Sequence, residues 1–285
     1  MSIEALISSQ NSDGGWPYRH GSSWTEPTVY AVLSLADAGK TAPAQRGIAW
    51  LIANQRPDGG WPPSAGIDES CWATALVALI PGERLGTLAH RQAIRWLLGT
   101  TGEETTSLYR LREWLLGNSA GPETRMPGWP WVPGSAAWVG PTALAMLALA
   151  KENRQRPSAA AEARIVQGRR FLIDRMCQGG GWNHGSVRAL GYEAPPYPET
   201  TGMALAALRG CENAGIEPSV SLARRFLGEC RSADALNWLR LGLRAQERLP
   251  EGYDPPAAIA YRTVPEMSLD LLVKAAEQGR NVFWM

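Results

Sequence analysis

Gln55-Arg-Pro-Asp-Gly-Gly-Trp61 is a motif whose related copies recur along this chain of 285 residues. Gln10-Asn-Ser-Asp-Gly-Gly-Trp16 matches it at five of seven positions and lies 45 residues earlier. Gln178-Gly-Gly-Gly-Trp182 is a shortened copy, and Gly128-Trp-Pro-Trp131 is a degenerate one. Each copy lies between two apolar helical patterns. A repeat of this length, about 45 residues, is typical of an array of helical hairpins.

The residue types in the motif suit a tight, structural loop. Adjacent glycines permit a sharp reversal after a helix ends, and an Asp can accept a hydrogen bond from a nearby backbone amide. A Trp covers the turn with a large apolar surface, while a Gln amide can bond free backbone carbonyls. We therefore interpret these loops as stabilising elements.

Helices before and after the loops differ in pattern. The helix expected at 44–54 is amphipathic, whereas Val29–Ala36 and Trp72–Leu79 are apolar nearly all round. Thr25-Glu-Pro-Thr28 is typical of a helix start, with Thr25 as the cap and Glu26 near the positive end of the dipole. The pattern predicts amphipathic helices outside and apolar helices inside. Roughly six hairpins could close into a double ring or form an open arc.

We predict one all-α domain spanning 1–285. The repeats cover about 1–210, and a helical remainder at 211–285 continues the hairpin pattern without glycine-rich loops. An insertion is expected at about 103–125, and the connection from Asn183 to Pro198 is long enough to form a lid.

Composition excludes several classes of function. A net charge of +1 without a basic run argues against nucleic-acid binding, and no apolar run approaches the ~20 residues of a membrane span. The N-terminus lacks a signal-peptide pattern, and the four cysteines show no CxxC spacing. We expect reduced thiols and a cytoplasmic protein. The 13 tryptophans, against 3 phenylalanines, call for an explanation.

The Gln…Asp-Gly-Gly-Trp loops resemble the QW repeats of squalene–hopene cyclases and oxidosqualene cyclases. They are also similar to the repeats of protein prenyltransferase β subunits, which need a second subunit. The resemblance implies an α/α toroid, with inner and outer rings of helices. It further implies that the N-termini of the inner helices surround the mouth of an apolar cavity, where those enzymes place their functional groups.

Carboxylates recur at the starts of the expected inner helices: Glu26, Asp68 with Glu69, and Glu199. A structural interpretation is that a Glu in the first helical turn is favoured by the helix dipole by ~0.3–1 kcal/mol. A functional interpretation is that burial raises the pKa of one of them and makes it a proton donor. We name Asp68, Glu69 and Glu199 as catalytic candidates, with the adjacent Asp68 and Glu69 preferred.

The chain departs from the resembling families at their catalytic motifs. Neither the Asp-x-Asp-Asp of proton-initiated cyclases nor the metal-binding Asp-Asp-x-x-Asp occurs. Glu69-Ser-Cys71 occupies the place of the prenyltransferase zinc motif Asp-x-Cys, but the later helix start at Glu199 offers no His. Because a catalytic zinc needs at least three protein ligands, we predict no metal and no cofactor.

Aromatic and sulfur-containing side chains near the inner starts predict a cavity for an apolar chain. Trp16, Trp61, Trp131 and Trp182 are assigned to the loops. The residues expected to bind substrate are Trp24, Glu26, Tyr30, Cys71, Trp72, Trp138, Met146, Tyr197 and Met203. Such a cavity could stabilise a carbocation by cation–π contacts, whereas plain core filling is the alternative.

Two functions are consistent with these patterns. The first is a terpene-cyclase-like enzyme that acts on an isoprenoid or similar apolar chain by acid-initiated carbocation chemistry. The second is a non-catalytic toroid that binds a lipid or a protein partner. An open interior with an acid facing it would favour the enzyme.

Overall fold

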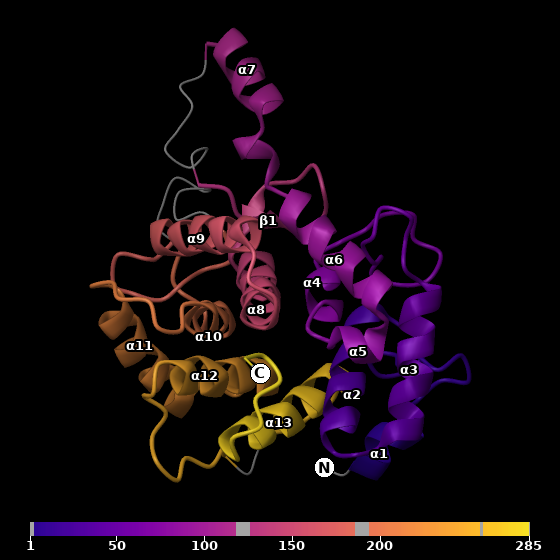
Figure 1. The fold of residues 1–285 in the computed structure, drawn as a ribbon. Coiled ribbons are helices and arrows are strands. Elements are labelled where there is room, and N and C mark those ends of the chain that lie inside the picture. The colour runs from indigo at the N-terminus through magenta and orange to yellow at the C-terminus, as the bar shows by residue number, and fades with distance from the viewer. Residues whose placement is uncertain (1–2, 118–125, 186–193, 257–258, 285) are drawn as a thin grey trace.

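The computed structural model describes residues 3–117, 126–185, 194–256 and 259–284, which form an α/α toroid of two concentric rings of helices (Figure 1). The inner ring consists of α2 Thr25–Asp37, α4 Ala73–Val77, α8 Val139–Gln155, α10 Pro198–Ala207, α12 Ala233–Ala245 and α13 Val264–Glu277. The outer ring consists of α1 Ile3–Ser8, α3 Thr41–Ala53, α6 Thr87–Gly99, α9 Ala159–Asp174 and α11 Ile216–Glu229.

The inner ring closes on itself. Each inner helix packs against the next, and α13 contacts both α12 and α2. Every residue of α8 from Val139 to Leu149 is buried, whereas α3 and α11 alternate between buried and exposed positions. The prediction of apolar helices inside and amphipathic helices outside is therefore confirmed, and the ring rather than the open arc is formed.

Buried tryptophans tie four of the outer helices, α1, α3, α6 and α9, to the inner helix that follows each of them. The indole N–H of Trp61 donates to the Leu51 carbonyl of α3 (2.7 Å), and its backbone N–H donates to the Thr74 hydroxyl of α4 (2.8 Å). The same two bonds are made by Trp16, Trp129 and Trp182. All four side chains are at most 2% exposed. Each tryptophan thus fixes one hairpin while its polar atom stays satisfied.

The other residues of the motif connect neighbouring hairpins. Gln55 Nε2 donates to the carbonyls of Gly59 and of Ala89 in α6, both at 3.0 Å. Asp58 accepts from the Gly60 amide (3.0 Å), and Gly59 has a φ of +94°. A Cβ on Gly59 would lie 2.8 Å from the carbonyl oxygen of Gln92, so only glycine fits there. The structural role predicted for these loops is confirmed.

Two details differ from the sequence prediction. Trp129, which follows a glycine as in the other loops, takes the buried position in the third loop, while Trp131 is 36% exposed. Trp129 lies in the strand β1 Trp129–Pro130, which pairs antiparallel with β2 Ala137–Trp138. Thr25 is the first residue of α2 rather than its cap, a position that Trp24 takes, and its hydroxyl donates to the Pro62 carbonyl at 2.6 Å.

The C-terminal segment, residues 278–284, fills one end of the ring, and Figure 1 shows it entering the centre. We call this segment the C-terminal plug. Phe283 is buried against Trp238 of α12, with ring centroids 5.7 Å apart. Lys151 of α8 donates to the carbonyls of Val282 (2.7 Å) and Leu79 (3.1 Å). The end of the ring at the C-termini of the inner helices is therefore plugged, and open space remains toward their N-termini.

Three short helices lie outside the two rings: α5 Gly82–Leu85, η1 Glu103–Thr105 and α7 Ser107–Leu115. The last two belong to the predicted insertion, of which residues 118–125 lie outside the described part of the chain, and α7 projects away from the ring (Figure 1). In the described ranges, no helix is both long enough and apolar enough to cross a membrane.

Candidate functional site

A cavity of about 230 Å³ lies at the end of the ring opposite the C-terminal plug. The first turns of α2, α8, α10 and α12 supply much of its wall, and the loops that precede α4, α8 and α10 supply the rest. Its lining residues are Glu26, Tyr30, Trp72, Trp131, Gly140, Leu144, His184, Glu199, Thr200, Met203, Asp234 and Trp238.

Three carboxylates face this cavity from equivalent positions. Glu26, Glu199 and Asp234 are each the second residue of an inner helix, in α2, α10 and α12 respectively. Gly140 is the second residue of α8, so the same position there carries no side chain and leaves room in the cavity. The ring geometry thus turns one helical position, repeated on different helices, into a cluster of acids.

Burial raises the pKa of all three acids. It raises the pKa of Glu26 to about 7, with a further increase from the charge of Glu199 and a partial decrease from the hydrogen bond that the Tyr18 hydroxyl donates. Burial and the charges of Glu199 and Glu26 raise the pKa of Asp234 well above its ordinary value. Burial also raises the pKa of Glu199, against the opposing influence of His184. Burial and the neighbouring charges therefore favour the protonated forms of these acids.

The helix dipole does not set the charge of these acids. A carboxylate in the first turn gains ~0.3–1 kcal/mol from the dipole, which favours the ionised form. The shift of the Glu26 pKa from 4.5 to about 7 corresponds to about 3 kcal/mol in favour of the neutral form. Burial outweighs the dipole, which is the arrangement typical of a functional acid rather than of a helix cap.

Aromatic side chains form the rest of the wall. Trp72 and Trp131 pack edge to face, with centroids 5.1 Å apart at 87°, and the Trp72 amide donates to the Trp131 carbonyl (2.8 Å). Trp238 lines the cavity and also packs on Phe283, so the C-terminal plug supports this part of the wall. Tyr30 is 2% exposed. The acids therefore face a cavity with an aromatic lining.

His184 and Tyr197 lie at the edge of the site. Their rings stack at 4.8 Å, and the His184 carbonyl accepts from the Val139 amide at the start of α8 (3.0 Å). Tyr197 is 42% exposed and does not line the cavity. The connection predicted as a lid includes both residues, but its residues 186–193 lie outside the described part of the chain.

The structure brings five of the predicted site residues to the cavity: Glu26, Tyr30, Trp72, Glu199 and Met203. The other residues predicted to bind substrate lie outside it: Trp24, Cys71, Trp138, Met146 and Tyr197. Met146, for example, faces the outer ring, where a Cβ on Gly168 of α9 would lie 2.8 Å from its Cγ.

Asp68 and Glu69 lie away from the cavity. Both are exposed in the loop before α4, and the Asp68 side chain, 96% exposed, pairs with Arg56. They precede Ala73, the first residue of α4, by five and four residues, so they do not occupy the helical position of Glu26 and Glu199. The prediction that placed Asp68 and Glu69 at the cavity is therefore wrong, because both lie in the loop before α4 rather than in its first turn.

Sequence reasoning missed Asp234, Trp238 and the cavity role of Trp131. α12 follows no glycine-rich loop, so its start was not aligned with the other inner helices. The available signal was Ser232, which caps α12 by accepting from the Ala235 amide and stands two residues before Asp234. The acids do not form a metal centre: in the described ranges, no three His, Cys, Asp or Glu side chains are placed to hold an ion.

Comparison with known proteins gives the fold. The sequence matches no family model and no curated protein. A GH8 endo-β-1,4-glucanase from an Achatina fulica gut metagenomic library is similar in structure, with a TM-score of 0.63, 15% identity and 98% of both chains covered. The endo-β-1,4-glucanase CMCax from Acetobacter xylinum has a TM-score of 0.60 at 13% identity, covering 98% of this chain and 99% of that one.

A terpene cyclase is also similar. The type II terpene cyclase MstE from Scytonema has a TM-score of 0.56 at 17% identity, covering 96% of this chain and 81% of that one. At these identities the likeness shows a shared α/α toroid, a fold that hosts different chemistries. The function must therefore be argued from the cavity.

Proposed function

We propose that this protein is an enzyme that converts an isoprenoid or similar apolar substrate by acid catalysis in the cavity on the ring axis. The observation that supports it is the cluster of buried carboxylates with raised pKa values in an aromatic-lined space. Asp234 is the proposed proton donor, because burial and the charges of Glu199 and Glu26 raise its pKa well above its ordinary value and so favour its protonated form. Here the acid role that the sequence assigned to Asp68 or Glu69 passes to a residue facing the cavity.

The proposed reaction is an isomerisation in which no proton is consumed. The Asp234 carboxyl proton adds to one carbon of a C=C bond, forming a C–H bond and leaving a cation on the other carbon. Attack by a second double bond closes a ring, and loss of a proton from the resulting cation to the Asp234 carboxylate, directly or through Glu26 or Glu199, forms the product and restores the donor. Trp72, Trp131 and Trp238 can stabilise the cation through their ring faces.

A glycoside hydrolase is the second candidate. Glu26, with its pKa raised to about 7, could act as the proton donor in acetal hydrolysis if a second carboxylate of the cluster is ionised and acts as base or nucleophile, beside the partly exposed Trp131. The solved glucanases share the toroid, which supports the comparison at the level of fold alone. Against this candidate, the Thr200 hydroxyl in the lining already donates to the Trp182 carbonyl (2.7 Å), so its oxygen can only accept a hydrogen bond from a sugar.

The test is a product assay in deuterated buffer. The purified protein would be incubated with squalene, linear prenyl diphosphates, geranylgeranyl dihydroxybenzoate and cello-oligosaccharides. Gas chromatography–mass spectrometry would detect cyclic products, and a reducing-sugar assay would detect hydrolysis. We expect a cyclic product that carries one deuterium, because the initiating proton comes from an exchangeable carboxyl group.

Matched variants locate the acid. Asp234→Asn keeps the shape of the side chain and should abolish the product, whereas Glu69→Gln alters an exposed acid outside the cavity and should leave turnover unchanged. Release of reducing sugar instead would select the second candidate. Retention of an apolar ligand without turnover would leave a non-catalytic binding protein and refute the proposal.

A further inference from the structure

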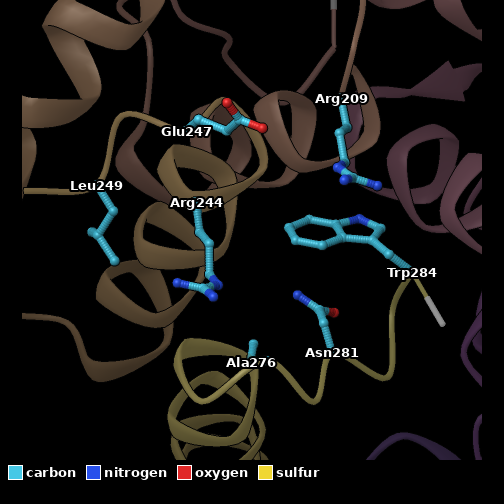
Figure 2. A pocket seen from close by; sticks show the side chains of 8 residues that line it. Arg209, Arg244, Glu247, Leu249, Ala276, Asn281 and Trp284 are labelled. Carbon is cyan, nitrogen blue, oxygen red and sulfur yellow. The ribbon is translucent and has the colours of Figure 1, made fainter.

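A second pocket, of about 510 Å³, lies at the opposite end of the ring from the carboxylate cavity. It is formed where α10, α12 and α13 end and where the C-terminal segment begins (Figure 2). The C-terminal plug separates it from the cavity described above. Its volume falls within the range of ordinary small-molecule sites, about 300–1,000 Å³.

Two guanidinium groups point into this pocket, those of Arg209 after α10 and Arg244 in the last turn of α12 (Figure 2). In the described ranges, neither has a hydrogen bond or an ion pair with another group of the protein; Arg209 lies over the Trp284 ring, 5.2 Å from its centroid. A basic residue near a helix C-terminus often bonds the last carbonyls, but neither side chain does so here. Their donors remain available to a ligand.

Buried donors without partners complete the lining. Asn281 is 6% exposed, and its Oδ1 accepts from the Phe283 amide (3.0 Å), yet its Nδ2 has no partner. Figure 2 shows this nitrogen directed toward the side of the pocket that holds Arg244. The indole nitrogen of Trp284 is also buried without a partner. A buried donor that stays unpaired is destabilising, so these groups indicate a missing acceptor.

Positive charge accumulates near the pocket. Burial and the charge of Arg209 lower the pKa of Arg154, so these two cations lie close enough to repel each other. Glu247 is the one acid that lines the pocket among the described residues. It is exposed, and its φ of +57° is a backbone conformation that residues other than glycine rarely adopt. The site is rich in donors and poor in acceptors.

We propose that this pocket binds a small phosphate-bearing molecule. The phosphate oxygens accept from Arg209, Arg244 and Asn281, since a guanidinium fork matches phosphate geometry and phosphate offers more acceptor oxygens than a carboxylate. The pocket is larger than a phosphate group, so an organic part of the ligand lies against Leu249 and Ala276. This site is independent of the carboxylate cavity and of the chemistry proposed there.

Isothermal titration calorimetry at constant ionic strength tests the proposal, with inorganic phosphate, pyrophosphate and AMP as probes. Saturable binding of at least one probe is expected. Arg209→Gln and Arg244→Gln each remove a charged donor from a position that is not fully buried, and each should weaken binding roughly tenfold or more. Arg280→Gln is the control, because this exposed arginine pairs with Asp37 outside the pocket.

Circular dichroism melting curves would show that the variants remain folded. Three results would overturn the proposal: no saturable binding of any probe, the same affinity in both pocket variants as in the wild type, or equal affinity for acetate. The calorimetry measures binding alone. The phosphate-site proposal can therefore fail or succeed independently of the product assay for the carboxylate cavity.

Discussion

Replacing Glu26 by glutamine should stabilise the protein at alkaline pH and have little effect at acidic pH. Burial raises the pKa of Glu26 from 4.5 to about 7 in the folded state. Between these two values the folded protein binds more protons at this site than the unfolded chain does. Stability therefore falls as the pH rises from about 4.5 to about 7, and the loss is complete above pH 7. Glutamine does not ionise, so the variant keeps this stability as the pH rises.

The magnitude follows from the size of the shift. A change of about 2.5 pH units at 1.36 kcal/mol per unit gives about 3 kcal/mol at pH 8, and only a few tenths of a kcal/mol at pH 4. The Tyr18 hydroxyl donates to the Glu26 carboxylate, and the glutamine Oε1 can accept the same bond. The substitution thus tests the charge while it keeps the hydrogen bond and the shape.

The assay is urea unfolding of wild type and Glu26→Gln between pH 4 and pH 8, with Glu69→Gln as the exposed control. The Glu26→Gln variant should be more stable than wild type by about 3 kcal/mol at pH 8, and the two should converge at pH 4. The control should follow the wild-type curve throughout. Parallel curves for wild type and Glu26→Gln would mean that Glu26 is hydrated and ionised, and the argument for a water-poor acid cluster would fail.

Three further changes test the fold. Trp61→Ala, at a side chain with no exposed surface, should lower the free energy of unfolding by roughly 3–5 kcal/mol in urea titrations; a loss below about 1 kcal/mol would contradict its role in the loop. Gly59→Ala should destabilise more than Gly39→Ala in thermal melts, because both glycines have positive φ but only Gly59 faces a backbone carbonyl at 2.8 Å; equal shifts would refute this. Arg240→Met should cost about 3–5 kcal/mol in urea titrations, because it removes the buried guanidinium that pairs with the buried Asp270 carboxylate (3.2 Å) and with Glu277 (2.8 Å); an unchanged midpoint would show that the remaining partners of Asp270, Lys274 and Tyr261, are sufficient.

Most of the fold could be predicted because its recurring element, the tryptophan loop, is encoded by a short local motif. A glycine followed by Trp16, Trp61, Trp129 or Trp182 marks each of the first four hairpins, and the two hydrogen bonds of each tryptophan explain why the pattern repeats. The assignment of Trp131 to the third loop was wrong because it followed the end of the motif rather than the glycine before the tryptophan. Closure of the ring depends on contacts between α13 and α2, about 240 residues apart in sequence, which no local pattern contains.

The site was harder to predict because it depends on one helical position rather than on a motif. Glu26 and Glu199 were found because each stands at the start of a helix that follows a tryptophan loop. Asp234 was missed because α12 follows no such loop, and Asp68 was favoured because adjacent acids suggest coupled titration. The distance of an acid from the helix start decides whether it belongs to the site. An acid at the second helical position faces the cavity, whereas an acid four or more residues before the helix faces solvent.

The energetics of that position argue for function. If the acids served only to complement helix dipoles, they would be ionised and hydrated, and each would gain ~0.3–1 kcal/mol. Glu26 instead carries a shift worth about 3 kcal/mol against its charged form, and the neighbouring carboxylates raise the pKa of Asp234 further. Proteins retain such destabilising groups where activity needs them. Two or more acids that resist ionisation together in a tryptophan-lined cavity therefore support the proposed proton transfer better than a role in helix stability alone.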